Sequence, residues 1–199
     1  MVVGFNGDVY VALGLSSKIK KISASTGLVS TSAGKIGGST LDGVLATSAG
    51  LNYPLYITSG SNGDLYINEG NFIRRIVSSS GRIYRYTNGT IITVAGNGTY
   101  GYSGDGGLAI AAKLYVPCGL TVSPITGEVY FVDGGNYRVR KFTPGGNITL
   151  VAGCGMPVYK GDGGLAVNAC LNSATDLILP NGEILILEPN RLRKIDGIF

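Results

Sequence analysis

The sequence contains no histidine and no tryptophan among its 199 residues. The lack of histidine excludes a His-ligated zinc site and a histidine general base in this chain. Charged residues make up only 14% of the chain and the formal net charge is +4, which by itself does not indicate a nucleic-acid-binding protein. No apolar run approaches the roughly 18 residues of a membrane helix, so we predict no membrane insertion by this segment.

Cysteine is also scarce. The three cysteines, Cys118, Cys154 and Cys170, are too few for a disulfide framework, and no two of them have the spacing of a metal clip. Cys154 and Cys170 lie within one loop-and-turn segment, and the sequence leaves open whether they are bonded.

Glycine and tyrosine, in contrast, are abundant. The chain has 33 glycines and twelve tyrosines, together with many β-branched residues. This mixture predicts short strands joined by tight turns. A hydrophobic content of 44% over this length is enough for a sizeable core.

Two sequence elements recur along the chain. One aligns without a gap in three copies, "DGVLATSAGLNYP", "DGGLAIAAKLYVP" and "DGGLAVNACLNSA", which start at Asp42, Asp105 and Asp162. The other occurs four times, as "GDVYVAL", "GDLYINE", "GEVYFVD" and "GEILILE". The chain is therefore an array of four copies that form one segment, with approximate units 1–51, 52–114, 115–171 and 172–199. The second copy has extra residues within "SSSGRIYRYTNG".

Each complete copy contains four short strands. In the third copy these are "CGLTVSP", "EVYFVD", "RVRKFT" and "NITLVAG", separated by turns rich in Gly, Pro and Asn. Four short antiparallel strands per repeat are typical of a propeller blade, so we predict an all-β fold of four-stranded antiparallel blades. The first copy begins at its second strand and the last ends after its third. We therefore expect three, four, four and three strands, or about three and a half blades.

The segment "GDGGLAIAAKLYVPCGLTVSPITGEVYFVDGGNYRVRKFTPGGNITLVAG" resembles the NHL-repeat β-propellers. In particular, it resembles the subtype with an SGDGG loop between blades, as in teneurin-like NHL domains. The resemblance implies a ring of six blades. We therefore expect this chain to be part of a longer polypeptide and to need further blades, or a second chain, to close the ring.

The aspartates of the glycine-rich loops, Asp42, Asp105 and Asp162, allow two interpretations. A carboxylate and backbone carbonyls suit calcium, but each loop offers a single carboxylate, so no metal or cofactor is predicted. The alternative is that each aspartate caps a short helical turn, whose Leu108, Ala112 and Leu114 are buried in the second loop. We favour the cap.

Basic residues occupy two adjacent columns of the third strand in all four copies. They are Lys20, Lys21, Arg74, Arg75, Arg140, Lys141, Arg193 and Lys194. One interpretation is a surface for an anionic partner such as RNA or an acidic protein segment. The other is structural, with one column bonded to the acids that end the second strands, Glu69, Asp133 and Glu188. The structural interpretation is favoured, because aromatic side chains for base stacking are missing from these columns.

The sequence predicts a scaffold without catalytic activity. No Ser or Cys stands beside a plausible base, and loops and one basic face are the expected contact surface for a protein partner. A calcium-dependent hydrolase or lactonase-like enzyme is the first alternative, because some propellers related to NHL repeats are lactonases or lyases. RNA or polyanion binding through the basic columns is the second.

Overall fold

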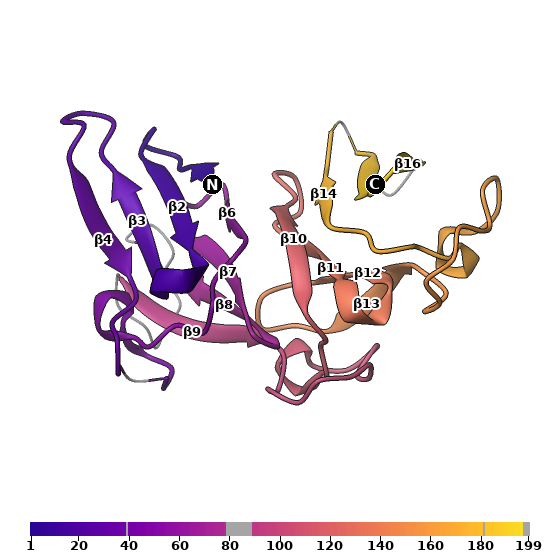
Figure 1. Cartoon of the computed structure of the whole chain (residues 1–199), viewed down its shortest axis with the longest axis horizontal. Helices are drawn as coiled ribbons and strands as arrows, with labels where there is room; N and C mark the ends of the chain where they lie inside the picture. The colour runs from indigo at the N-terminus through magenta and orange to yellow at the C-terminus, as the bar shows by residue number, and fades with distance from the viewer. Residues whose placement is uncertain (39, 79–88, 181, 197–199) are drawn as a thin grey trace. The chain divides into compact units, whose positions relative to one another are not determined.

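The computed structural model describes residues 1–38, 40–78, 89–180 and 182–196 (Figure 1). The extra residues of the second copy, 79–88, lie outside the described residues. The described part of the chain consists of short antiparallel strands joined by turns, and its only helices are single 3₁₀ turns. The predicted all-β fold of antiparallel blades is therefore confirmed.

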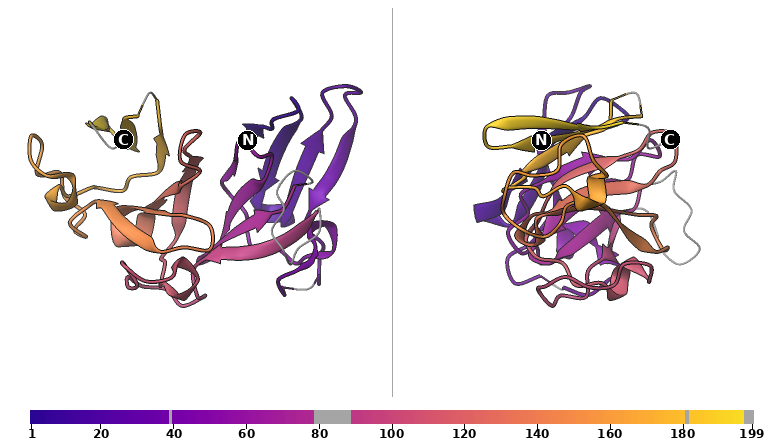
Figure 2. Two further views of the ribbon diagram at one scale, coloured as in Figure 1. Left: turned by 180° about the vertical axis from the view of Figure 1, so that it is seen from behind. Right: turned by 90° about the vertical axis from the view of Figure 1, so that its right-hand side faces the viewer.

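Four antiparallel sheets follow one another along the chain. The first sheet contains β1 (Val2–Val3), β2 (Val9–Leu13), β3 (Lys18–Ile22) and β4 (Val29–Ala33). The second has the order β5-β9-β8-β7-β6, from β5 (Val44–Leu45), β6 (Ile57–Ser59), β7 (Leu65–Glu69), β8 (Phe72–Ile76) and β9 (Thr90–Ala95). The third contains β10 (Pro117–Val122), β11 (Val129–Asp133), β12 (Arg138–Phe142) and β13 (Ile148–Ala152). The fourth contains β14 (Asp176–Ile178), β15 (Ile184–Glu188) and β16 (Arg191–Ile195), drawn in orange and yellow in Figure 2.

The 3₁₀ turns occur at two recurring places. Two of them join the second strand to the third, η1 (Gly14–Ser16) and η4 (Gly134–Asn136). The other three lie in the segments that lead from one sheet to the next, η2 (Ala46–Ser48), η3 (Ala109–Ala111) and η5 (Ala166–Asn168). We call these segments the first (34–56), second (96–116) and third (153–175) connectors. No helix of the described residues is long and apolar enough to cross a membrane.

The chain forms two compact units, Met1–Val94 and Ala95–Phe199, each with its own core. In the first unit the core contains Ile19, Ala33, Ala46, Ala49, Leu51, Ile57, Leu65, Ile67, Ile76 and Ile91. In the second it contains Tyr130, Val132, Val139, Ala152, Leu171, Ala174, Leu177, Ile184 and Ile186. Strands contribute alternate residues to these cores and connectors contribute alanines and leucines, so each core combines sheet and connector residues.

The predicted strand count is wrong at two places. The first sheet has four strands rather than three, because Val2 and Val3 pair with Tyr10 and Val9 as a short first strand. The second sheet has five, because Val44 and Leu45 of the first connector add a strand to its outer edge by pairing with β9. Two-residue strands carry too little periodicity to be recognised in a sequence.

The glycine that precedes each complete DGG loop is required by close packing. Gly104 has a φ of +94°, and a Cβ atom there would lie 2.8 Å from the Cα of Ala112. Gly161 repeats this geometry, with a φ of +93° and a distance of 2.7 Å to the Cα of Ala169. Both the left-handed conformation and the lack of space favour glycine, so each loop folds back on its own connector.

Candidate functional site

The two basic columns lie on opposite faces of each sheet. Consecutive residues of a strand point to opposite sides, and in the second, third and fourth sheets the members of each pair bond to different acids. In the first column, Arg74, Arg140 and Arg193 face the connectors, whereas Lys20 bonds to Thr31 within its own sheet. The second, Lys21, Arg75, Lys141 and Lys194, is on the side of the turns before the second strands. The pairs therefore do not form one basic face.

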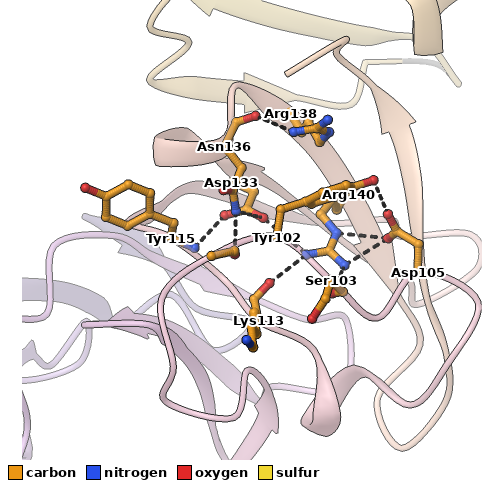
Figure 3. A network of polar contacts seen from close by, with 10 residues as sticks. Tyr102, Ser103, Asp105, Lys113, Tyr115, Asp133, Asn136, Arg138 and Arg140 are labelled. Atoms are coloured by element: carbon orange, nitrogen blue, oxygen red, sulfur yellow. Dashed lines mark hydrogen bonds and ion pairs between the residues drawn. The ribbon is translucent and has the colours of Figure 1, made fainter. Parts of the chain in front are cut away.

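Arg140 is the centre of the most extensive polar network (Figure 3). It is fully buried, and its guanidinium forms ion pairs with Asp133 at 3.2 Å and Asp105 at 2.9 Å. It also donates hydrogen bonds to the backbone carbonyls of Lys113, at 3.0 Å, and Ser103, at 2.9 Å. The arginine thus joins its own sheet to both ends of the loop in the second connector.

Asp133, at the end of β11, accepts hydrogen bonds from three kinds of donor. Its carboxylate accepts the backbone N–H of Tyr115 at 2.8 Å, the amide of Asn136 at 2.8 Å and the guanidinium of Arg140. Burial raises the pKa of Asp133 above its ordinary value, and these donors act in the opposite direction. The pairing of Asp133 with a third-strand arginine was predicted from the sequence and is confirmed.

Arg74 occupies the same position in the second sheet but has fewer partners. It pairs with Glu69 at 2.8 Å and with Asp42 at 3.2 Å, so the predicted contact with Glu69 is also confirmed. Burial raises the pKa of Glu69. The Nε of Arg74 has no hydrogen-bond partner among the described residues. Thr40 and Gly50 of the first connector correspond by alignment to Ser103 and Lys113 of the second. They line a cavity of about 540 Å³ beside Arg74.

In the fourth sheet Arg193 does not contact Glu188, and this predicted pair is wrong. Arg193 forms an ion pair with Asp162 and donates to the carbonyls of Cys170, at 2.7 Å, and Lys160, at 3.3 Å. Glu188 accepts the backbone N–H of Asn172 at 2.5 Å. The contacts of Arg193 with the third connector therefore repeat those of Arg140 with the second.

The first sheet differs from the other three. Lys20 donates to the hydroxyl of Thr31 at 2.9 Å, within its own sheet. Lys20 bonds to no glycine-rich loop among the described residues. Its neighbour Lys21 lies 3.2 Å from Asp8.

The second column pairs with acids that sequence reasoning missed. Lys21 and Arg75 pair with Asp8 and Asp64, and Lys141 pairs with Glu128 at 2.9 Å. Lys194 pairs with Glu183 at 3.2 Å and with Asp196 at 2.6 Å. The signal was present, because an acid follows the glycine at the start of every "G(D/E)" second-strand element. Seven of the eight cations in the two columns therefore have a carboxylate partner.

The predicted helix caps are absent. The residues before the 3₁₀ turns of the three connectors are Leu45, Leu108 and Leu165, and none has a side-chain capping bond. Instead, Asp105 and Asp162 bond to the arginines described above, and Asp42 also accepts the N–H and hydroxyl of Thr93. These aspartates hold the guanidinium of the next sheet rather than a helix end.

Burial around the 3₁₀ turn of the second connector matches the prediction only in part. Leu114 and Ala112 are buried as predicted, whereas Leu108 is 52% exposed. The second connector also exposes aromatic side chains. Tyr100 is 71% and Tyr115 42% exposed, and their ring centroids lie 5.8 Å apart.

A third tyrosine of the second connector, Tyr102, is anchored to the arginines. The guanidinium carbon of Arg138 lies 3.7 Å from the ring centroid of Tyr102, and that of Arg140 lies at 5.1 Å. The hydroxyl of Tyr102 donates to Asp105. Tyr102 therefore rests on the buried network of the third sheet (Figure 3).

The cysteine question left open by the sequence is answered. Cys154 and Cys170 form a disulfide that closes a separation of 16 residues within the third connector. Cys118 is the remaining free cysteine, and burial raises the pKa of its thiol to about 12. Among the described residues, no three His, Cys, Asp or Glu side chains gather in a way that could hold a metal ion.

Comparisons with known proteins agree with this fold. No protein-family model matches the chain. The chain is similar to teneurin-1 of Gallus gallus, with 31% identity over 166 residues, and to teneurin-3 of Mus musculus, with 29% identity over 157 residues. These matches cover 76% and 72% of this chain but only 6% and 5% of the two teneurins. The chain thus corresponds to a small part of each relative.

Solved structures show the same architecture at lower identity. A structural-genomics protein of unknown function from Bacteroides thetaiotaomicron superposes with a TM-score of 0.70 at 22% identity, over 97% of this chain and 45% of that one. A streptogramin B lyase has a TM-score of 0.52 at 19% identity, over 96% of this chain and 51% of that one. A protein described as a putative gluconolactonase has a TM-score of 0.59 at 12% identity, over 97% of this chain and 58% of that one. Together with the blade-like sheets, these likenesses show that the chain has an NHL-like β-propeller fold.

Proposed function

We propose that this chain is a propeller segment of the SGDGG-loop, teneurin-like NHL subtype, and that it is a non-enzymatic scaffold for a protein partner. The observation that carries the proposal is the exposed aromatic surface of the second connector. We call Tyr100 and Tyr115 the tyrosine pair. Tyrosine and arginine are enriched where proteins bind one another, because they offer a large contact area with little loss of conformational freedom.

Rigidity distinguishes this surface from an ordinary exposed loop. Tyr102 is held against Arg138 and Arg140, and the backbone N–H of Tyr115 is fixed by Asp133. The backbone of Tyr115 is therefore held in place before a partner arrives, and the ring of Tyr100 lies against that of Tyr115, which lowers the entropic cost of binding. The similarity to SGDGG-type loops rests on the two complete loops at Gly104 and Gly161, which share their fold and their arginine contacts.

The two alternatives have less support. A lyase and a putative gluconolactonase share the fold, but the chain has no histidine, and the described residues contain no cluster of three potential metal ligands. A polyanion surface would need unpaired cations. Seven of the eight column cations are already paired with carboxylates, and the two columns face opposite ways.

A peptide selection tests the proposal. The whole chain is panned against a random phage-displayed peptide library, and the selected binders are measured again on the variants Tyr100→Ser with Tyr115→Ser, and on Tyr53→Ser as the control. Tyr53 is 50% exposed but belongs to the first connector. We expect the binders to weaken at least tenfold on the double variant only.

Two results would contradict the proposal. One is a set of binders that are indifferent to the tyrosine pair. The other is turnover of a lactone panel that depends on added calcium, which would favour the enzymatic alternative. Binding of heparin or poly(U) that is lost in Arg74→Ala and Arg140→Ala variants of retained fold would favour the polyanion alternative.

A further inference from the structure

A tyrosine of the second connector covers two arginines of the third sheet. The ring centroid of Tyr102 lies 3.7 Å from the guanidinium carbon of Arg138 and 5.1 Å from that of Arg140 (Figure 3). The hydroxyl of the same tyrosine donates to Asp105. One phenol ring thus covers the guanidinium groups and bonds to the aspartate of the loop.

The third connector repeats this arrangement, but the first connector has no tyrosine for it. Tyr159 stands three residues before the loop aspartate, as Tyr102 does, and its ring centroid lies 4.3 Å from the guanidinium carbon of Arg191. The first connector has a serine at this position of the alignment, Ser39, which lies outside the described residues. The phenol ring is therefore missing from one of the three connectors.

A cavity lies beside the residues that correspond to the covered arginines. Phe72 and Arg74 align with Arg138 and Arg140, and both line the cavity of about 540 Å³. They are two residues apart in one strand, so they lie on the same face of the sheet. Thr40 lines the cavity from the side of the first connector. The cavity thus lies between this connector and the two strand positions that a tyrosine covers in the third sheet.

Arg74 has unsatisfied hydrogen-bond donors beside this cavity. Its side chain is 4% exposed, and its Nη1 donates to Glu69 at 2.8 Å. Among the described residues, its Nε and Nη2 have no hydrogen-bond partner, although Asp42 lies 3.2 Å from Nη2. In Arg140 the same two nitrogens are bonded, Nε to Asp105 at 3.0 Å and Nη2 to a backbone carbonyl at 2.9 Å. Buried donors without an acceptor are costly, so a ligand oxygen beside Arg74 is favoured.

The surroundings of Arg74 favour a neutral, aromatic ligand. Glu69 and Asp42 already offset the charge of the arginine, so an anionic ligand would lie close to two carboxylates. The apolar side chains of Leu51 and Phe72 line the same cavity and favour a ring over a polyol. A hydroxyl on that ring can accept a hydrogen bond from Arg74 and donate one to Asp42.

We propose that the cavity beside Arg74 is a binding site for a para-substituted phenol, which is either a free small molecule or the tyrosine side chain of a peptide. The ring packs against Phe72, and the hydroxyl bridges Arg74 and Asp42. The ligand thus takes the place that Tyr102 has in the second connector. The site shares no residue with the tyrosine pair, so it does not depend on the proposed scaffold function.

Nuclear magnetic resonance of the intact ¹⁵N-labelled chain tests the proposal, with p-cresol as the probe. We expect saturable shifts of the backbone amides of Phe72 and Thr93, which line the cavity, and of the Nε–H of Arg74. The dissociation constant should be about 1 mM or below, as fits so small a ligand. The Nε–H of Arg140 is the internal control and should not shift, because it is already bonded to Asp105.

Related ligands test the chemistry. Toluene lacks the hydroxyl and 4-methylanisole has it blocked, so both should bind at least fivefold more weakly than p-cresol. Tighter binding of 4-methylbenzoate than of p-cresol would overturn the proposal in favour of an anion site. An N-acetylated, C-amidated Gly-Tyr-Gly peptide distinguishes the two sources of the phenol. Binding tighter than that of p-cresol assigns the site to a tyrosine side chain, and binding no tighter assigns it to a free phenol.

Two variants locate the site. Phe72→Leu removes the ring that packs against the ligand, and Asp42→Asn replaces the charged acceptor by a weaker neutral one. Each should weaken p-cresol binding at least threefold, while Asp105→Asn, the matched change in the second connector, should leave it unchanged. The amide spectrum of each variant shows whether its fold is retained. The proposal is overturned if p-cresol causes no saturable shift at Arg74, or if the wild type and both cavity variants bind it equally.

Discussion

The outer strands of the first and third sheets differ in the burial of their first apolar residue. Among the described residues no connector lies beside Val29 of β4, which is 63% exposed, while Ile148 of β13 bonds to the second connector and is fully buried. Both residues hold the same place in their sheets, since Val29 pairs with Ile22 and Ile148 with Phe142. The difference teaches that a blade is completed by the connector that precedes it.

The largest effect should come from the arginine that fastens the connector. Arg140→Met leaves the buried carboxylate of Asp133 without its cation, so we expect a loss of about 3–5 kcal/mol in the free energy of unfolding. Arg193→Met is the matched change, and because Asp162 is 73% exposed it should cost less than about 1 kcal/mol. Urea denaturation followed by circular dichroism measures both, and equal losses would argue against a special role for the third sheet.

The buried outer strand should show the next effect. Ile148→Ala removes a fully buried side chain and should cost about 3 kcal/mol. Val29→Ala, at the same place in the uncovered strand, should change the stability by less than about 0.5 kcal/mol. A similar cost for the two substitutions, measured by urea denaturation, would show that the connector contributes nothing to the burial of β13.

The second and third connectors use different fastenings at the same positions. Asn97 and Lys113 of the second correspond by alignment to the bonded Cys154 and Cys170 of the third. Replacing both cysteines by alanine opens a loop of this length and should cost about 3 kcal/mol. Cys118→Ala is the control, and limited proteolysis should then find new cleavage within residues 153–175 only in the double variant. Unchanged stability and proteolysis would mean that the disulfide is dispensable.

The smallest effect is expected at the loop aspartates. Asp105→Asn weakens the bonds to Arg140 and Tyr102 and should cost about 1 kcal/mol. Asp162→Asn, at a largely exposed carboxylate, should have almost no effect. Thermal unfolding of the two variants compares these losses of stability. A larger loss in Asp162→Asn than in Asp105→Asn would contradict the prediction.

The sequence predicted the repeat, the strands and the buried partners of Arg74 and Arg140, because strand alternation and recurrence place these residues without knowledge of the loops. It failed for Arg193, since Glu188 and Asp162 are both within reach of that column and only the backbone path of the connector decides between them. It also failed for the aspartate caps. An aspartate before a small-residue turn resembles a helix cap, and the arginine that binds it lies 35 residues further along in the case of Asp105 and Arg140.

The tyrosine pair was missed for a similar reason. Tyr100 and Tyr115 stand 15 residues apart in the chain, and no repeat of either residue draws attention to them. Their proximity depends on the fold of the second connector, which is held by Arg140 and Asp133. Interactions between loops and strands therefore mark the limit of what the repeat pattern predicts.

Amide hydrogen exchange at Ile148 and Val29 tests most directly whether a connector completes the next blade. The N–H of Ile148 is bonded to Gly107, whereas that of Val29 has no acceptor among the described residues. We predict that the Ile148 amide exchanges at least a hundredfold more slowly than that of Val29, and that Arg140→Met abolishes most of the difference while the Thr149 amide stays protected. Equal exchange of the two amides in the wild type would contradict the interpretation of the connector as part of the blade.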